Sequence, residues 1–446
     1  MQKKLLAVAV AGALAVPGIA LAQSSVTISG YMKVGMDNVR FSGATAPAGA
    51  AGITRAQSSE NRVVDHSSRI LFNITEDLGG GLQAIGQMDT RFNVSDIPQP
   101  NSLGYAGAVG GGNTWVGLRS KSWGTVTFGR HDLHYGKAGD DTAAKAGSLQ
   151  LISSSIFDVV GGPIASTSTA SQATTSRAMA GQTRTNNVVR WDSPQWGIFS
   201  ATVAASTNPL QAGGGGTNVE GDVHTSATGL AGTGDRAGTT IRRKGSGWNL
   251  NPKLTGKDWF VEWSHWQAKQ DTNNSHGLTF STSATTATAV QHDQRSDVLA
   301  GNMRFGGFKI GLAWNRSRTT DPASGLVSGD RKAWAIPLSY VWGRHSVSGH
   351  WTKTGSSSSV TVAGATTALN VTVSGSSTGA QMWAIAYDYS MSKRTHIGLS
   401  YGQLRNDANA NYGLFYNAQS AFGSASNAAL AGEDSRIVAA TLRHNF

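Results

Sequence analysis

The sequence predicts an all-β protein, a 16-stranded antiparallel transmembrane β-barrel with long extracellular loops. First, patterned segments alternate apolar residues with polar or small ones, which is the period of a β-strand. Second, these segments come in pairs, with a tight turn inside each pair and a long polar loop after it, as in bacterial outer-membrane barrels. Third, aromatic residues gather near segment ends, where a lipid–water boundary favours them: Trp115, Trp123, Trp191, Trp196, Trp259, Trp342, Trp351, Trp383 and Tyr389.

The first 22 residues have the pattern of a secretory signal peptide. Lys3 and Lys4 form a positively charged start, an apolar stretch follows, and Ala20-Leu21-Ala22 provides a cleavage site of small residues. We expect residues 1–22 to be removed and residues 23–446 to form one barrel. Pro is scarce and no stretch resembles a linker between domains.

Composition excludes several kinds of function. The 446-residue chain has a formal net charge of +11, but an exported protein does not meet the genome, so we expect no nucleic-acid partner. The positive charge is then available to ions, lipid headgroups or small acidic solutes. Because the chain has no Cys, disulfides, haem attachment and thiolate metal sites are excluded. We expect no cofactor.

The strands are predicted in chain order. An opening strand covers 25–40 and a closing strand covers 435–446. On the closing strand, Val438, Leu442 and Phe446 share the face that we expect to meet lipid, and Arg443 falls on the opposite face. Seven hairpins lie between the two strands, and the fourth turns at Asn251–Gly256. Sixteen strands allow the first and last to pair, which removes the exposed sheet edges. The predicted hairpins are 69–75 with 82–92, 113–119 with 125–130, 186–192 with 198–206, 240–250 with 257–267, 298–305 with 308–318, 332–341 with 344–353, and 381–389 with 395–405.

Six stretches spread over the chain resemble the general porins of the Gram-negative outer membrane, of the beta-proteobacterial type. They are SSVTISG, SRILFNITEDLGGGLQAIGQ, NTWVGLRSKSWGTVTFGR, RTNNVVRWDSPQWG, YDYSMSKRTHIGLSYG and the final LRHNF. The resemblance implies a multi-pass barrel in the outer membrane, in contact with its lipid, that forms a water-filled channel for small hydrophilic solutes and ions. It also implies a homotrimer, a third loop folded into the pore, and a terminal Phe446 that the barrel-assembly machinery reads.

The third long loop, about 131–184, is the longest, which favours a functional role. It carries Asp140 and Asp141, and Asp158, which precedes a Gly-Gly pair that begins three residues on. In the porins that the chain resembles, an acidic residue just ahead of Gly-Gly lies on the constriction loop. Asp158 resembles that residue. Asp89 matches an acidic pore-lining position of that family, and the strand phase also turns Asp89 toward the lumen.

The opposite wall is predicted to be basic. Strand phase places Lys33, Arg69 and Arg91 on the lumen face, with Tyr31 beside Lys33, and Arg69 and Arg184 match basic wall positions of the family. The family usually has a further arginine where this chain has Gly112, which puts the familiar three-arginine cluster in doubt. Acids on the loop facing bases on the wall create a transverse field that orients dipolar solutes. With Arg190, on the same strand face as Arg184, the bases number five against four acids, so we expect weak anion selectivity.

Other functions remain open at this stage. An outer-membrane enzyme would need an acid–His or Ser–His constellation, but the His residues are scattered, and the pair His131 and His134 has no clear third metal ligand; we therefore expect no catalysis. A channel specific for an organic acid, a phosphate or a sugar is one alternative. A non-transport role as adhesin or structural anchor is another, since the Ser/Thr/Gly-rich loops provide surface. With no phosphate-binding loop in view, transport is expected to be passive.

Overall fold

The computed structural model describes residues 24–43, 59–65, 68–92, 94, 110, 112–134, 156–157, 184–207, 246–269, 293–320, 327–356, 360–362, 371–373, 377–408, 410, 412, 414 and 432–446. In this part of the chain, seventeen strands form one sheet and two short strands form a separate pair. The strands are β1 (Ser25–Ser42), β2 (Ser59–Asp65), β3 (Arg69–Gly79), β4 (Leu82–Arg91), β5 (Thr114–Ser120), β6 (Gly124–Asp132), β7 (Arg184–Asp192), β8 (Phe199–Ser206), β9 (Ser246–Thr255), β10 (Trp259–Lys269), β11 (Asp293–Phe305), β12 (Phe308–Thr320), β13 (Val327–Trp342), β14 (His345–Thr354), β15 (Val360–Val362), β16 (Val371–Val373), β17 (Ala380–Ser390), β18 (Thr395–Asn406) and β19 (Asp434–Asn445).

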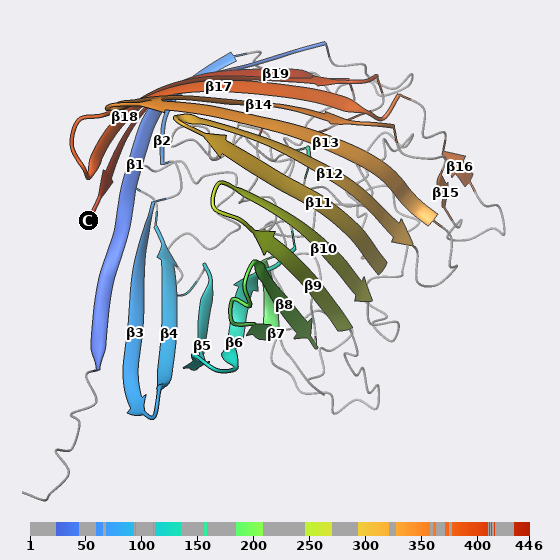
Figure 1. Cartoon of the computed structure of the whole chain (residues 1–446). Helices are drawn as coiled ribbons and strands as arrows, with labels where there is room; N and C mark the ends of the chain where they lie inside the picture. The colour runs from blue at the N-terminus through green and yellow to red at the C-terminus, as the bar shows by residue number, and fades with distance from the viewer. Residues whose placement is uncertain are drawn as a thin grey trace, which may run out of the picture.

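The large sheet closes into an antiparallel barrel (Figure 1). From β3 onward each strand of this sheet pairs with the next one in it, with β14 pairing with β17, and β1 pairs with β19 from Tyr31↔Asn445 to Ser42↔Asp434. β2 and β3 both pair with β1, β2 with residues 34–40 and β3 with residues 25–31, so together they fill one position. The barrel therefore has sixteen strand positions, which confirms the predicted fold class, and β2 is an additional strand that the sequence did not reveal.

The interruption between β2 and β3 is held by one buried carboxylate. Asp65 accepts a hydrogen bond from the backbone N–H of Ser68 at 2.8 Å and another from that of Val94 at 3.3 Å. The Ser68 hydroxyl accepts in turn from the backbone N–H of Lys33 at 2.9 Å. These side chains satisfy backbone groups where the strand ladder is interrupted, which a buried break requires.

The predicted hairpins are confirmed in the part of the chain that the structure describes, with one corrected turn; residues 240–245, the start of the fourth hairpin, lie outside that part. Two-residue turns at Gly306-Gly307 and Gly343-Arg344 begin with glycines at φ +57° and +56°, the left-handed conformation that tight hairpins need. The fourth hairpin was predicted to turn at Asn251–Gly256. Instead β9 continues through Asn251 to Thr255, and the turn comes at 256–258. Beside Pro252 the pairing between β9 and β10 is interrupted. There the Asn251 side chain donates to the Trp263 carbonyl at 2.9 Å, so this segment stays in the strand although its sequence is typical of a turn.

Side chains alternate between an apolar outer face and a polar interior. On β1, Ile28, Met32 and Met36 are exposed, whereas Tyr31 and Lys33 are buried inside. On β19, Val438 and Leu442 face outward, and Phe446 stays 39% exposed. Phe446 exchanges two backbone hydrogen bonds with Gly30, of 3.3 and 3.1 Å, so the last residue continues the seam between the first and last strands. Among the described residues, no helix has the length and apolar character of a membrane span.

Candidate pore-lining site

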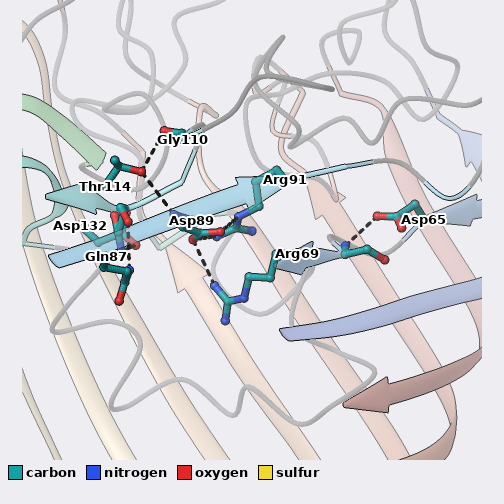
Figure 2. A network of polar contacts seen from close by, with 10 residues as sticks. Asp65, Arg69, Gln87, Asp89, Arg91, Gly110, Thr114 and Asp132 are labelled. Carbon is teal, nitrogen blue, oxygen red and sulfur yellow. Dashed lines mark hydrogen bonds and ion pairs between the residues drawn. The ribbon is translucent and has the colours of Figure 1, made fainter. Parts of the chain in front are cut away.

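Asp89 is the centre of a charged cluster on the inner wall (Figure 2). Arg91, on the same strand, donates from Nε and Nη2 to the two carboxylate oxygens of Asp89 at 2.9 and 3.0 Å. Arg69, from the neighbouring strand β3, places Nη1 3.6 Å from Oδ2 of Asp89. A bidentate contact of this kind fixes both groups, because the planar guanidinium matches the carboxylate. One carboxylate thus holds two arginines toward the interior.

Gly112 packs directly against this carboxylate. Its backbone N–H donates to the Asp89 carbonyl at 2.8 Å, and a Cβ added at Gly112 would overlap the Asp89 side chain. The backbone N–H of Asp89 donates to the Thr114 hydroxyl at 3.3 Å, and that hydroxyl donates to the Gly110 carbonyl at 3.2 Å. The porins that the chain resembles usually have an arginine at the position of Gly112. Here that position has no room for a side chain, because the Asp89 carboxylate occupies the space.

A third arginine joins the cluster from the last strand. Arg443 of β19 lies over the Tyr31 ring at 4.2 Å, and Arg69 lies over the same ring at 5.1 Å. Guanidinium groups over an aromatic face are attracted by its quadrupole, so Tyr31 holds both in place. The strand phase had already placed Arg443 on the inner face, but only the closure of β19 onto β1 brings it near Arg69. Three arginines and Asp89 therefore gather where these strands meet, and Asp388 lies within electrostatic reach of Arg443.

The structure describes the other predicted pore-lining residues only in part. Lys33 is on the inner face of β1 and fully buried. Arg184 begins β7, where its backbone pairs with Asp132. Asp140, Asp141 and Asp158 lie outside the described residues. The assignment of all these residues to the pore lining stays a prediction.

Ile156 and Phe157 in the middle of the third loop are described, and both are bound to the barrel wall. Arg331 of β13 is fully buried; its Nη1 donates to the Ile156 carbonyl at 2.6 Å, and its Nη2 donates to the Phe157 carbonyl at 2.9 Å. Nη1 also donates to the Thr354 hydroxyl at 2.8 Å. Ile156 is fully buried among inward-facing residues that include Met382 and Leu404. Sequence reasoning missed Arg331 because the predicted strand began one residue later.

The two histidines of the HDLH motif have separate environments. His131 stacks on Trp115 with ring centroids 5.8 Å apart. His134 lies beyond the end of β6 and is fully buried, with Nδ1 2.9 Å from the Ser264 hydroxyl. Burial, with a smaller contribution from His265, holds the pKa of His134 well below its usual value. Across the described residues, no three side chains of His, Cys, Asp or Glu are grouped as a metal site would require.

Comparison with known proteins agrees with this geometry. Residues 7–409 match the family model described as Gram-negative porin. An outer membrane porin protein of Bordetella pertussis is 34% identical over 134 residues, a match that spans 29% of this chain and 33% of that protein.

Three solved structures share the fold. An anion-selective porin from Comamonas acidovorans has a TM-score of 0.58 at 16% identity, over 95% of this chain and 100% of that one. OmpT of Vibrio cholerae in its trimer form has a TM-score of 0.54 at 13% identity, over 95% and 99%. OmpF of Salmonella typhi in complex with daunomycin has a TM-score of 0.52 at 11% identity, over 94% and 97%. The family match covers most of the chain, and the chain belongs to the Gram-negative porin family, whose members are channels of the outer membrane.

Proposed function

We propose that this chain forms a water-filled channel through which small hydrophilic solutes and ions diffuse passively, with a weak preference for anions. The observation that carries the anion preference is the group of Arg69, Arg91 and Arg443, in which Asp89 contacts Arg69 and Arg91, and Arg443 shares the Tyr31 ring with Arg69. An anion about 4 Å from an exposed guanidinium gains about 1 kcal/mol in water. The cluster therefore favours anions by a few-fold, less at high salt, since charges are screened over about 10 Å at 0.1 M.

The third loop is proposed to narrow the pore. Arg331 and the buried pair Ile156 and Phe157 support this, because they bind part of that loop to the inner wall. We further propose that the chain assembles as a homotrimer, that its Phe446 is read during barrel assembly, and that the channel performs no enzymatic step. The trimer form solved for OmpT of Vibrio cholerae supports the trimer by analogy of fold alone.

Liposome swelling tests the channel directly. Liposomes that contain the refolded protein are diluted into iso-osmotic solutions of uncharged sugars of increasing size. A general pore admits the smallest sugars fastest and shows a smooth decline with size, whatever the stereochemistry. Swelling with one sugar only would contradict a general pore and favour a specific channel. No swelling from protein with an intact barrel would contradict a channel altogether.

A further inference from the structure

The last long loop, between β18 and β19, begins by turning back into the barrel. β18 ends at Asn406 and β19 begins at Asp434. Early in this loop the structure describes Ala410, Tyr412 and Leu414, and all three are at most 3% exposed. Side chains of a loop that stood away from the barrel would be exposed to water. We call the described residues at the start of the loop the mouth segment: Asp407, Ala408, Ala410, Tyr412 and Leu414.

The buried side chains of the mouth segment pack on the inner wall of the barrel. They share one apolar cluster with Met382, Leu404 and Ile437. These three wall residues alternate along their strands with exposed apolar residues such as Trp383 and Val438, so they point into the lumen. Leu404 lies two residues before the end of β18, and Ile437 lies three after the start of β19. The contact is therefore at the mouth of the barrel on the side of the long loops.

Asn406 fixes the mouth segment in this inward direction. Its side-chain amide donates to the Tyr412 carbonyl at 2.9 Å and to the Glu433 carbonyl at 2.6 Å. Its amide oxygen accepts from the backbone N–H of Tyr412 at 3.1 Å. The backbone N–H of Gly432 adds a bond to the Ala410 carbonyl at 2.8 Å. One side chain thus joins both ends of the loop to the end of β18 and satisfies backbone groups that burial removes from water.

Tyr412 and the third loop share one guanidinium group. Nη1 of Arg331, which donates to the Ile156 carbonyl, also donates to the Tyr412 hydroxyl at 3.4 Å. The guanidinium carbon lies 5.7 Å from the centre of the Tyr412 ring, within the range of cation–π attraction. Ile156 belongs to the same apolar cluster as Tyr412. Two loops from distant parts of the chain therefore meet at a single inward-facing arginine.

A segment that packs on the inner wall takes width from the mouth. Stacked layers of polypeptide lie about 10 Å apart, so the mouth segment narrows the opening by a comparable amount where it covers the wall. This narrowing is separate from the arginine cluster. Ile437 and Arg443 are six residues apart on β19, which is about 20 Å along a strand. A solute that enters from the side of the long loops passes the mouth segment first.

We propose that the mouth segment is a second constriction, at the outer mouth of the pore, and that Tyr412 sets its size limit. The inference rests on the proposed channel function and adds to it a filter that excludes bulky hydrophilic solutes, charged or uncharged, before they reach the arginine cluster. Because Arg331 binds both loops, the position of this filter is coupled to that of the third loop.

The test compares two double variants that remove the same residue types. Asn406→Ala/Tyr412→Ala removes the hydrogen bonds and the ring that hold the mouth segment. The matched control is Asn38→Ala/Tyr401→Ala, on the outer face. Asn38 donates to the side-chain oxygen of Asn61 at 2.7 Å, and the Tyr401 ring packs on a neighbouring tryptophan with centroids 4.9 Å apart. The control therefore loses similar contacts without changing the mouth segment.

The size limit is measured by single-channel recording in a planar bilayer, with neutral polyethylene glycols of increasing size added to each side in turn. A polymer that enters the mouth lowers the conductance, whereas an excluded one does not. In Asn406→Ala/Tyr412→Ala we expect the largest polymer that enters from the long-loop side to gain roughly 2–5 Å in radius, up to half of one packed layer. Tyr412→Ala alone should give a smaller shift in the same direction. The control should keep the limit of the unchanged protein, and polymers on the short-turn side should show no difference.

Loss of one oxygen atom tests the coupling between the two loops. Tyr412→Phe keeps the ring and removes the hydroxyl that Arg331 contacts. We expect the size limit to stay the same and the current variance of the open state to rise about two- to fivefold. In an Arg331→Met background the same substitution should change nothing further, because its partner is already gone. An equal effect in both backgrounds would contradict the coupling.

Two results would overturn the second constriction itself. One is an Asn406→Ala/Tyr412→Ala barrel that folds, by heat-modifiable electrophoresis, and excludes the same polymers as the control. The other is an equal shift from both sides of the bilayer, which would place the change deeper in the pore than the mouth. A folded protein that conducts no ions would instead refute the channel on which the inference rests, and that result is distinct from a channel with an unaltered size limit.

Discussion

Replacing Arg331 with Met should loosen the third loop and raise the noise of the open channel. Two of the hydrogen bonds from Arg331 reach the loop, at the Ile156 and Phe157 carbonyls. Bonds from a charged donor contribute about 1.5–3 kcal/mol each. The two carbonyls freed by the substitution can accept hydrogen bonds from channel water, which offsets part of the loss. We therefore expect the free energy that attaches the loop to the wall to fall by about 2–4 kcal/mol, which raises the fraction of molecules with a detached loop on the order of 30- to 1000-fold.

The loop should not be lost altogether. The Ile156 side chain is fully buried and that of Phe157 nearly so, and each such side chain retains about 1.5–3 kcal/mol of hydrophobic stabilisation. The expected phenotype is therefore brief excursions, seen as a larger current variance in the open state, rather than a permanently wider pore. Single-channel recording in planar bilayers measures this variance.

Two further variants make the experiment decisive. Lys332→Met changes the next residue, which points to the opposite face and is exposed, so its current noise should equal that of the unchanged protein. Arg331→Lys keeps the charge but loses the planar double contact, so its noise should be intermediate. The reasoning is refuted if Arg331→Met gives a folded barrel, by heat-modifiable electrophoresis, whose noise matches that of Lys332→Met.

Three other predictions concern stability. Gly112→Ala should lower the free energy of unfolding by about 1–3 kcal/mol, because the added methyl overlaps the Asp89 carboxylate; an unchanged melting temperature would contradict this. Asp37→Ala removes the carboxylate that Arg62 contacts at 2.7 Å with both side chains buried, and should cost about 3–5 kcal/mol in urea unfolding, more than Asp37→Leu/Arg62→Leu. His134 has a pKa below that of the unfolded chain, so the unfolded chain takes up its proton first and stability falls as pH drops below about 6.5. His134→Gln should flatten that part of the urea midpoint–pH curve, and an unaltered curve would exclude His134 as its cause.

Alternation of residue types was sufficient to predict the sixteen strand positions, though not the extra strand β2, because each of them has one face toward lipid and one toward the interior. It also placed Tyr31, Lys33, Asp89 and Arg443 on the inner face. It failed at Asn251-Pro252, which is typical of a turn, because a side-chain hydrogen bond to the neighbouring strand keeps the segment extended. Such a bond depends on register, which one segment alone does not encode.

The candidate site could be predicted only in part. Arg331 escaped notice because the residues before it, SGD, are typical of a loop, whereas pairing of Asp330 with Arg318 extends β13 past them. Its partners Ile156 and Phe157 lie about 175 residues away along the chain, a distance that no local pattern spans. Arg443 was seen as inward-facing, but its place beside Arg69 and Tyr31 follows from closure of the barrel.

The most direct test of the central claim is the reversal potential of the refolded channel in a planar bilayer under a KCl gradient. We expect a potential on the anion-selective side at 0.1 M salt, with Arg69→Gln and Arg443→Gln each lowering the anion-to-cation permeability ratio about two- to fourfold, from the roughly 1 kcal/mol that one charge contributes in water. Arg405→Gln, which removes the same charge from the outer face of β18, should leave the ratio unchanged. A cation-selective potential, or equal shifts from Arg69→Gln and Arg405→Gln, would contradict the claim that the arginine cluster around Asp89 governs what the pore admits.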